Sequence, residues 1–218
     1  MENLTTWLQP SFDFEAIGVA EREVARANYQ PAPATPPRAV IRAFNRLNTV
    51  ELAVVRLASR SSRSLAPKWA AIALSWLGNG WLYPLVLAVL VARWGVSSLK
   101  IAAPACAIAA LLHCVYPVLK RYCSRRRPFQ ADPRLPSLLE TLDEHSFPSG
   151  HTMTLAGVMT PIVMLWPAAL LTALIVVGAV AWSRVATAHH YPSDVLAGAV
   201  LGVGIGYPMT IGLVALWS

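Results

Sequence analysis

Four long stretches of this chain contain no Asp, Glu, Lys or Arg: Trp69–Ala92, Ile101–Leu119, Thr152–Ser183 and Val195–Ser218. Hydrophobic residues make up 56% of the 218 residues and charged residues only 13%, with a mean hydropathy of +0.49. A helix that crosses a bilayer needs about 20 apolar residues. Because backbone polar groups have no water partner inside lipid, such segments fold as helices. The sequence therefore predicts a membrane protein of the all-α class.

Three of these stretches are each long enough for one span, and Thr152–Ser183 is long enough for two short helices hinged near Pro161–Pro167. We therefore predict an all-α, polytopic membrane helix bundle of about five spans. Leu77–Gly80 reads Leu-Gly-Asn-Gly and is expected to break the first helix. The last helix carries three glycines at intervals of four, which permit close helix contact: Gly198, Gly202 and Gly206.

Residues 1–68 form a polar, arginine-rich N-terminal extension to the predicted membrane domain, residues 69–218. The proline-rich segment Pro31–Pro37 predicts an extended linker. Val40–Leu57 has apolar residues at helical spacing beside several arginines, which predicts an amphipathic helix at the membrane surface. The N-terminus lacks a charged start followed by an apolar run and a cleavage site, so we expect no signal peptide.

Three short segments combine cationic, hydroxyl and imidazole side chains: Lys120-x6-Arg127-Pro128, Pro148-Ser149-Gly150-His151 and Ser183-Arg184-x5-His190-x3-Asp194. A phosphoryl group in transfer spreads negative charge over three oxygens, so its site needs several fixed cationic donors. Lys120, Arg127 and Arg184 are the candidates, because an arginine fork suits two oxygens at once. Ser149 and Gly150 are predicted to begin a helix whose free N–H groups cradle an anion.

His190 and Asp194 are four residues apart, and Pro192 favours a first helical turn between them. This spacing lets the carboxylate accept a proton from one imidazole nitrogen, which leaves the other nitrogen free to attack phosphorus. His151 is then available to protonate the leaving oxygen. Each segment alone has a structural explanation, such as a basic membrane boundary or a helix cap, but the joint order and spacing favour a phosphate site.

Together, the three segments resemble the signature of the type 2 phosphatidic acid phosphatases, a superfamily that also includes bacterial acid phosphatases and vanadium haloperoxidases. The resemblance covers roughly Ser75–Ala199, and no signature position departs from the pattern. It implies that His190 is the nucleophile, that Asp194 orients it, and that His151 acts first as an acid and then as a base. It also implies a phosphohistidine intermediate that water hydrolyses, without a metal or other cofactor.

The function predicted from these residues is a metal-independent lipid phosphate phosphatase acting on a phosphomonoester or pyrophosphate of a lipid. The sequence offers no clustered carboxylates suited to Mg²⁺, and its three cysteines predict neither a disulfide framework nor a metal site. Two alternatives stay open: a lipid phosphotransferase that uses an alcohol acceptor, and a non-catalytic lipid-binding membrane protein. The expected partners are a phosphorylated lipid substrate and membrane lipids, with no nucleic acid and no obligate protein partner.

Several residues beside the signature receive other predictions. His189 adjoins His190 but lies five residues from Asp194, so it is predicted to pack behind the site. Arg121, Arg125 and Arg126 exceed what one phosphate needs. They are predicted to hold a lipid headgroup or to anchor the chain to anionic lipid.

The span count predicts that all three segments meet at one membrane face, because the chain crosses and recrosses the membrane between His151 and His190. If the N-terminal extension shares that face, only Arg93 and Lys100 of the 18 Lys and Arg residues fall on the opposite one. Loops that stay in the cytoplasm carry such an excess of basic residues. We therefore predict a multi-pass protein of a bacterial inner (plasma) membrane with its active site on the cytoplasmic face.

Overall fold

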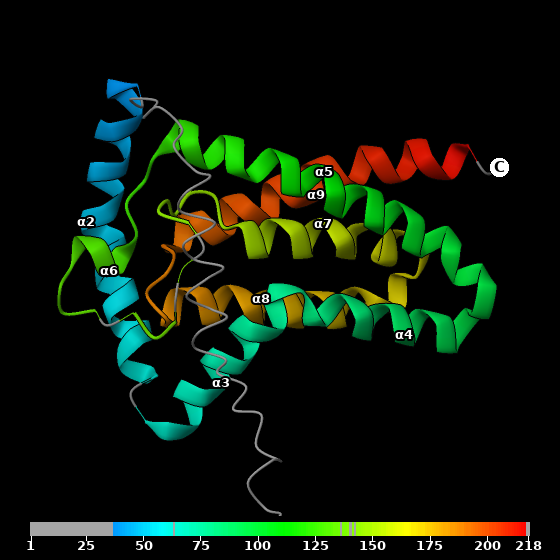
Figure 1. Cartoon of the computed structure of the whole chain (residues 1–218), viewed down its shortest axis with the longest axis horizontal. Coiled ribbons are helices and arrows are strands. Elements are labelled where there is room, and N and C mark those ends of the chain that lie inside the picture. The colour runs from blue at the N-terminus through cyan, green and yellow to red at the C-terminus, as the bar shows by residue number, and fades with distance from the viewer. Residues whose placement is uncertain (1–36, 63, 136, 140, 142, 217–218) are drawn as a thin grey trace, which may run out of the picture. The chain divides into compact units, whose positions relative to one another are not determined.

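The computed structural model describes residues 37–62, 64–135, 137–139, 141 and 143–216. Within these residues the chain forms the following elements (Figure 1): α2 (Arg38–Ser61), α3 (Leu65–Trp76), the π-helical turn η1 (Leu77–Trp81), α4 (Leu82–Trp94), the 3-10 turn η2 (Gly95–Ser98), α5 (Leu99–Cys123), α6 (Pro128–Ala131), α7 (Gly150–Leu165), the 3-10 turn η3 (Pro167–Ala169), α8 (Leu170–Ala186) and α9 (Pro192–Ala215). Apart from Pro37, the predicted linker lies outside the described residues.

Two glycines divide the apolar stretch Leu65–Cys123 into separate helices. The stretch has 59 residues, and as one helix it would extend about 90 Å, roughly three times the hydrocarbon thickness. Gly80 has a φ of 125° and Gly95 a φ of 55°, which are conformations that residues with a Cβ rarely adopt. Gly80 falls in η1, where the sequence predicts a break. Gly95 turns the chain back, so that α4 and α5 run antiparallel (Figure 1).

The long axis of the bundle is followed by α4, α5, α7, α8 and α9 (Figure 1). In the described part of the chain, three segments are long and apolar enough to cross a membrane: Leu65–Cys123, Pro167–Ala186 and Pro192–Ala215. The apolar helix Gly150–Leu165 is shorter. The prediction of an all-α membrane bundle of about five spans is confirmed. The hinge between α7 and α8 falls at Trp166, while Pro161 lies inside α7.

One end of the bundle gathers the ends of four helices. There α5 and α8 finish, α7 and α9 begin, and α2 lies across them (Figure 1). The side chain of Val55 on α2 is buried with Leu135, Val185 and Tyr191, and the Ser59 hydroxyl donates to the carbonyl of Ala186. The predicted amphipathic helix Val40–Leu57 thus exists within α2 and packs on the bundle. The division of the chain at residue 68 stays a prediction.

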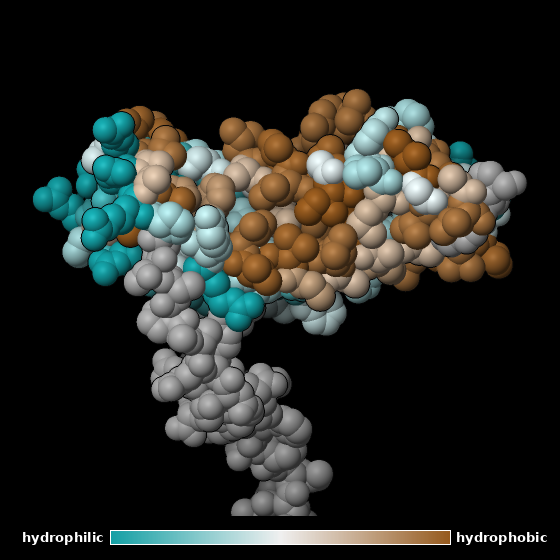
Figure 2. Space-filling view, turned by 90° about the horizontal axis from the view of Figure 1, so that it is seen from above, coloured by the Kyte–Doolittle hydropathy of each residue, from teal (hydrophilic) through white to brown (hydrophobic). Residues whose placement is uncertain are grey.

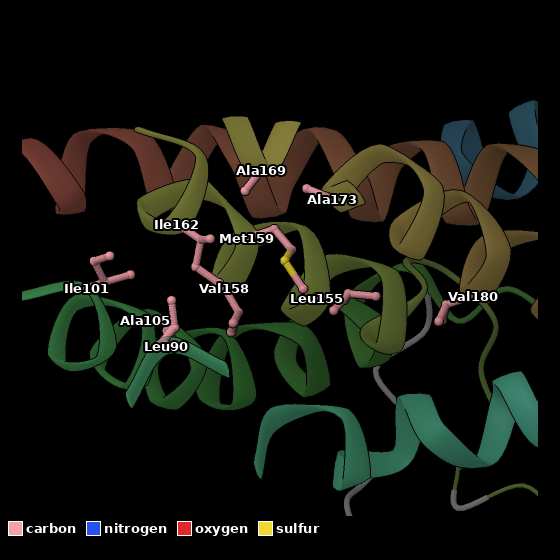
Figure 3. Close-up of a cluster of buried hydrophobic side chains, with 10 residues drawn as sticks. All are labelled: Leu90, Ile101, Ala105, Leu155, Val158, Met159, Ile162, Ala169, Ala173 and Val180. Atoms are coloured by element: carbon pink, nitrogen blue, oxygen red, sulfur yellow. The ribbon is translucent and has the colours of Figure 1, made fainter. Parts of the chain in front are cut away.

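The centre of the bundle is occupied by α7. Leu155, Val158 and Met159 of α7 form a buried cluster with Ala105 of α5 and Ala173 of α8 (Figure 3). In lipid, close side-chain packing rather than exclusion of water drives helix association. The packing of α7 at the centre of the bundle therefore fixes the position of its first residue, Gly150.

The contact between α7 and α9 depends on the glycine stripe predicted from the sequence. A Cβ atom on Gly202 would lie 2.2 Å from the carbonyl oxygen of Met153, and one on Gly198 would lie 2.6 Å from that of Ser149. The two backbones therefore touch where a side chain would separate them. One turn before Gly198, the carbonyl of Asp194 accepts a hydrogen bond of 3.0 Å from the Ser149 amide. The glycines thus hold the second and third motifs together.

The outer surface matches the membrane prediction. Large apolar side chains are exposed along the bundle, among them Leu85, Leu171, Ile175 and Val200. Figure 2 shows hydrophobic residues covering the length of the bundle, and hydrophilic residues gathered at the end that carries α2. Charges collected at one end of an apolar bundle indicate contact with water and lipid headgroups there.

Candidate active site

The first motif is shaped by the end of α5 and the short helix α6. Ser124 adopts a left-handed conformation, with a φ of 46°, and ends α5. Pro128 then occupies the first position of α6, and Arg127 precedes it in an extended conformation. This geometry turns the side chains of Lys120 and Arg127 inward, where they are 5% and 2% exposed. Two of the three predicted phosphate-binding cations are therefore buried beside one another.

The third motif is shaped by the start of α9. Pro192 takes the first helical position, and the Tyr191 amide donates a hydrogen bond of 2.8 Å to Oδ2 of Asp194. The same oxygen lies 3.5 Å from Nδ1 of His190, and no described group makes a hydrogen bond with this ring nitrogen. The predicted pair is in contact, but at this distance and geometry it makes no hydrogen bond. Catalytic hydrogen bonds often form fully only when a substrate is present.

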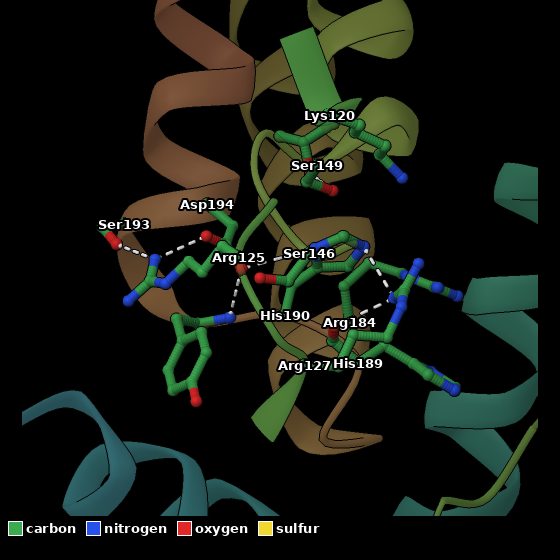
Figure 4. A network of polar contacts seen from close by, with 12 residues as sticks. Lys120, Arg125, Arg127, Ser146, Ser149, Arg184, His189, His190, Ser193 and Asp194 are labelled. Carbon is green, nitrogen blue, oxygen red and sulfur yellow. Dashed lines mark hydrogen bonds and ion pairs between the residues drawn. The ribbon is translucent and has the colours of Figure 1, made fainter. Parts of the chain in front are cut away.

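The other ring nitrogen of His190 faces the cations. Its Nε2 atom lies 3.5 Å from Nη1 of Arg127 (Figure 4). Burial, followed by the positive charges of Arg127 and Arg184, lowers the pKa of His190 well below its ordinary value. The imidazole is therefore neutral at neutral pH. With its proton on Nδ1, beside Asp194, it would present an unprotonated Nε2 towards Arg127 and the other cations.

Arg184 completes the cationic group from the last turn of α8. Its guanidinium is 5% exposed and donates to the hydroxyl of Ser75. Its Nε–H has no hydrogen-bond partner among the described residues. A buried charged donor without a partner is costly. An anion bound in the site would satisfy it.

The second motif begins α7. Ser149 is the residue before the helix, and its hydroxyl lies 3.2 Å from that of Thr152. Because the Ser149 amide bonds to Asp194, an anion cradle at this helix start would use the next amides, at Gly150 and His151. A Cβ atom on Gly150 would lie 3.3 Å from the ring of Tyr116, so a larger residue would crowd the close contact between Tyr116 and the start of α7.

His151 projects from the first turn of α7. Its Nε2 atom contacts the side-chain oxygen of Asn79, which comes from η1, the break in the first apolar stretch. Gly78 lies against the same imidazole, since a Cβ there would be 3.2 Å from its Cδ2 atom. The Leu-Gly-Asn-Gly break therefore interrupts the first apolar helix and also supplies two residues that contact His151.

The side chain of His189 bonds to groups outside the predicted site residues, which agrees with its predicted packing role. One of its ring nitrogens lies 2.9 Å from the Thr187 hydroxyl, and the other lies 3.0 Å from the carbonyl of Leu139. Burial, and next the charge of Arg184, lower the pKa of His189 to about 3. The neutral ring therefore fastens the loop before α7 to the turn before α9.

The family model of the PAP2 superfamily matches residues 101–217, which is more than half of the chain. The chain belongs to the PAP2 superfamily. A similar fold is found in the crystal structure of a transmembrane PAP2 type phosphatidylglycerolphosphate phosphatase from Bacillus subtilis. It matches with a TM-score of 0.60 and 19% identity, over 91% of this chain and 94% of that chain. At this identity the likeness establishes the fold. A comparison with curated proteins finds no significant match.

In this PAP2 protein, Asp143 is a site residue that the sequence interpretation missed. Its carboxylate lies 2.6 Å from Nζ of Lys120 and 2.7 Å from Nη2 of Arg127. Burial favours the neutral acid, but the charges of Lys120 and Arg127 outweigh it and lower the pKa of Asp143. A carboxylate thus occupies the position where two cations would hold a phosphate. The only available signal was an acidic residue between two basic motifs, which is also typical of a solvated loop.

Arg125 also differs from its prediction. Its side chain is fully buried and pairs with Asp194 and Glu51, so it is unavailable to a lipid headgroup or to the membrane surface. The partner Glu51 belongs to α2, in the N-terminal extension. No sequence pattern links these positions, which are 74 residues apart.

No group of three or more His, Cys, Asp or Glu side chains that could hold a metal ion occurs in the described part of this PAP2 protein. The predicted phosphate-binding groups of the site are instead three buried cations, Lys120, Arg127 and Arg184. Such a donor set suits an anion, because cations and N–H groups compensate negative charge. Metal independence itself stays a prediction.

Proposed function

We propose that this PAP2 protein is a metal-independent lipid phosphate phosphatase that works through a phosphohistidine at His190. The supporting observation is the placement of one neutral, buried imidazole between a carboxylate and a group of cations. Asp194 lies on the Nδ1 side of the ring, and Arg127 on the Nε2 side. This is the arrangement that a histidine nucleophile for a phosphate requires.

In the first step, Nε2 of His190 attacks phosphorus and the bond from phosphorus to the lipid oxygen breaks. Lys120, Arg127 and Arg184 hold the three remaining phosphoryl oxygens, over which negative charge is spread in the transition state. His151 donates a proton to the leaving lipid oxygen. Asp194 accepts the Nδ1–H bond of His190 and compensates the positive charge that develops on the ring.

In the second step, water attacks the phosphohistidine. His151, now unprotonated, takes a proton from this water, and the bond from phosphorus to Nε2 breaks. The electron pair returns to Nε2 of His190, and inorganic phosphate leaves. Asp143 must release Lys120 and Arg127 before a phosphate enters, because both cations are already paired with it.

The substrate we propose is a lipid whose phosphate lies at headgroup level. The cations lie at the polar end of an apolar bundle, so a phosphate reaches them while its tails stay in lipid. Phosphatidic acid, phosphatidylglycerophosphate, prenyl phosphates or diphosphates, sphingoid phosphates and lipid A phosphates share this chemistry. The Bacillus subtilis structure, named for phosphatidylglycerolphosphate, makes that lipid the first to test.

We also propose that this site faces the cytoplasm of a bacterial inner membrane. Residues of α2 bond directly to the first and third motifs, so this part of the basic extension lies at the same end of the bundle as the site. Among the Lys and Arg residues that the structure describes, only Arg93 and Lys100 lie near the other end, around η2. An excess of Lys and Arg on one side favours its retention in the cytoplasm.

The test is phosphate release from a panel of lipids by protein purified in detergent. We expect activity to survive EDTA and to be inhibited by vanadate, which mimics five-coordinate phosphorus. His190→Ala should reduce kcat by roughly 10³-fold or more, since it removes the nucleophile. The matched control is His189→Ala, which should cost less than about tenfold, because its ring only fastens a loop.

Three results would decide against parts of this proposal. Loss of activity on chelation, restored by a divalent ion, would exclude the metal-independent mechanism. If His189 proved essential and His190 dispensable, the assignment of His190 as the nucleophile would be wrong. Transfer of phosphate to an added alcohol in preference to water would make the protein a phosphotransferase.

A further inference from the structure

Arg125 is the most extensively bonded cation of the site, although it faces no substrate position. Its Nη1 atom donates to Oδ1 of Asp194 at 2.5 Å and to the Ser193 hydroxyl at 2.7 Å (Figure 4). Nη2 donates to Glu51 at 2.5 Å and to Asn48 at 2.7 Å, and Nε donates to Asn48 at 3.0 Å. These contacts match the five N–H donors of a guanidinium. Arg125 therefore has no donor left for a phosphate.

The aromatic neighbours of Arg125 fix the plane of its guanidinium. The ring of Tyr191 lies 4.0 Å from Cζ, and the ring of Phe44 lies 4.7 Å from it. A cation over an aromatic face is attracted to it, and the attraction grows where water is excluded. The guanidinium is thus held by both stacking and hydrogen bonds.

The carboxylate of Asp194 is consequently fixed at both oxygens. Oδ1 accepts from Arg125, while Oδ2 accepts from the Tyr191 amide and faces Nδ1 of His190. Without Arg125, the carboxylate would lose its ion pair at Oδ1 in a fully buried position, and one of the two restraints that hold it against the imidazole would be gone. An uncompensated buried charge is strongly unfavourable.

The helix α2 supports this arrangement from outside the signature. Besides its bond to Arg125, Glu51 accepts from the Ser193 amide at 2.7 Å and from the Ser193 hydroxyl at 2.9 Å. Amides in the first turn of a helix have no intrahelical acceptor, and a negative charge is favoured there. Glu51 therefore joins α2 to the first turn of α9, which carries Asp194.

We propose that Arg125, held by Asn48 and Glu51 of α2, is a positioning residue that fixes the Asp194 carboxylate against His190. The N-terminal extension is then part of the catalytic apparatus, through a helix that touches no substrate. This inference rests on the proposed role of His190 as the nucleophile. It assigns Arg125 to the rate of the chemical step and not to phosphate binding.

The test compares kcat, KM and the inhibition constant of vanadate for Arg125→Gln, Arg125→Lys and Glu51→Gln in detergent. Arg125→Gln should lower kcat by about 10²-fold, while KM and the vanadate constant change less than about threefold. Arg125→Lys should recover part of kcat, since one charge returns without the fork. The matched control is Arg46→Gln, an exposed arginine of α2, which should leave all three constants unchanged.

A double-mutant cycle separates positioning from general stability. If Arg125 acts through Asp194, then Arg125→Gln combined with Asp194→Asn should lose no more kcat than Asp194→Asn alone. If Arg125→Gln does not fold, as judged by size exclusion and thermal unfolding, Glu51→Gln and Asn48→Ala carry the same test with Arg125 present.

The proposal is overturned if folded variants keep the kcat of the parent, if KM and the vanadate constant rise in step with the loss, or if the cycle is additive. These outcomes are distinct from failure of the proposed function. If the proposed function itself were wrong, the His190→Ala variant would still release phosphate.

Discussion

The carboxylate of Asp143 pairs with two of the three cations expected to hold the substrate phosphate. Because its pKa is lowered by Lys120 and Arg127 against the effect of burial, it is ionised across the neutral range. A substrate phosphate therefore competes with an internal anion. The neutral amide in Asp143→Asn should compete less well and bring tighter binding of vanadate.

We expect Asp143→Asn to lower the vanadate inhibition constant by roughly fivefold, which corresponds to about 1 kcal/mol for a partly exposed ion pair. The KM for the lipid should fall in the same direction. Inhibition curves measured in detergent check this, with the exposed neighbour Glu144→Gln as the matched control. A vanadate constant that rises would show that Asp143 holds the cations in place instead of competing with the phosphate.

At the scale of elements, the position of Asp194 depends on how closely α9 approaches α7. A Cβ atom on Gly202 would lie 2.2 Å from a backbone carbonyl, which cannot move aside as a side chain does. Gly202→Ala should therefore separate the two helices and destabilise the protein by roughly 1–3 kcal/mol. We expect a clearly lower midpoint of thermal unfolding in detergent, together with a lower kcat.

The same helix provides the control for this prediction. A Cβ atom on Gly204 would have nothing within 4 Å, so Gly204→Ala should leave the midpoint unchanged or raise it slightly, as alanine favours the helix. Equal effects of the two substitutions would show that the loss does not come from the contact between α7 and α9.

The elements were predictable to the extent that their causes are local. Charge-free stretches predict the helices, and glycine spacing predicts the face of α9 that packs on α7. The pairing of His190 with Asp194 follows from a spacing of four and from Pro192. The partners of Arg125 could not be predicted, because Asn48 lies 77 residues away and on a helix whose position depends on packing. The same holds for Asn79, which reaches His151 only through the break at η1.

At the scale of the whole molecule, contacts of α2 bear on which membrane face carries the site. The distribution of Lys and Arg predicts the orientation only if the N-terminal extension lies on the same membrane face as the three motifs. In the sequence alone, one span more or fewer before the first motif would put them on opposite faces. Glu51 bonds to both Arg125 and Ser193, so α2 and the motifs lie at the same end of the bundle whatever the count. The charge bias then supports the proposal that this end faces the cytoplasm.

Cys123 reports on this orientation, because it is the last residue of α5 and partly exposed at the site's end of the bundle. In a Cys106→Ala, Cys114→Ala background, we expect Cys123 to resist a membrane-impermeant thiol reagent in sealed cells and to react once the membrane is opened. Val96→Cys, placed in this background together with Cys123→Ala, is the control. Val96 is 82% exposed in the turn at the other end, so its cysteine should react in sealed cells. The reverse pattern would place the active site on the outer face, where the lipid phosphates of the outer leaflet would be its substrates.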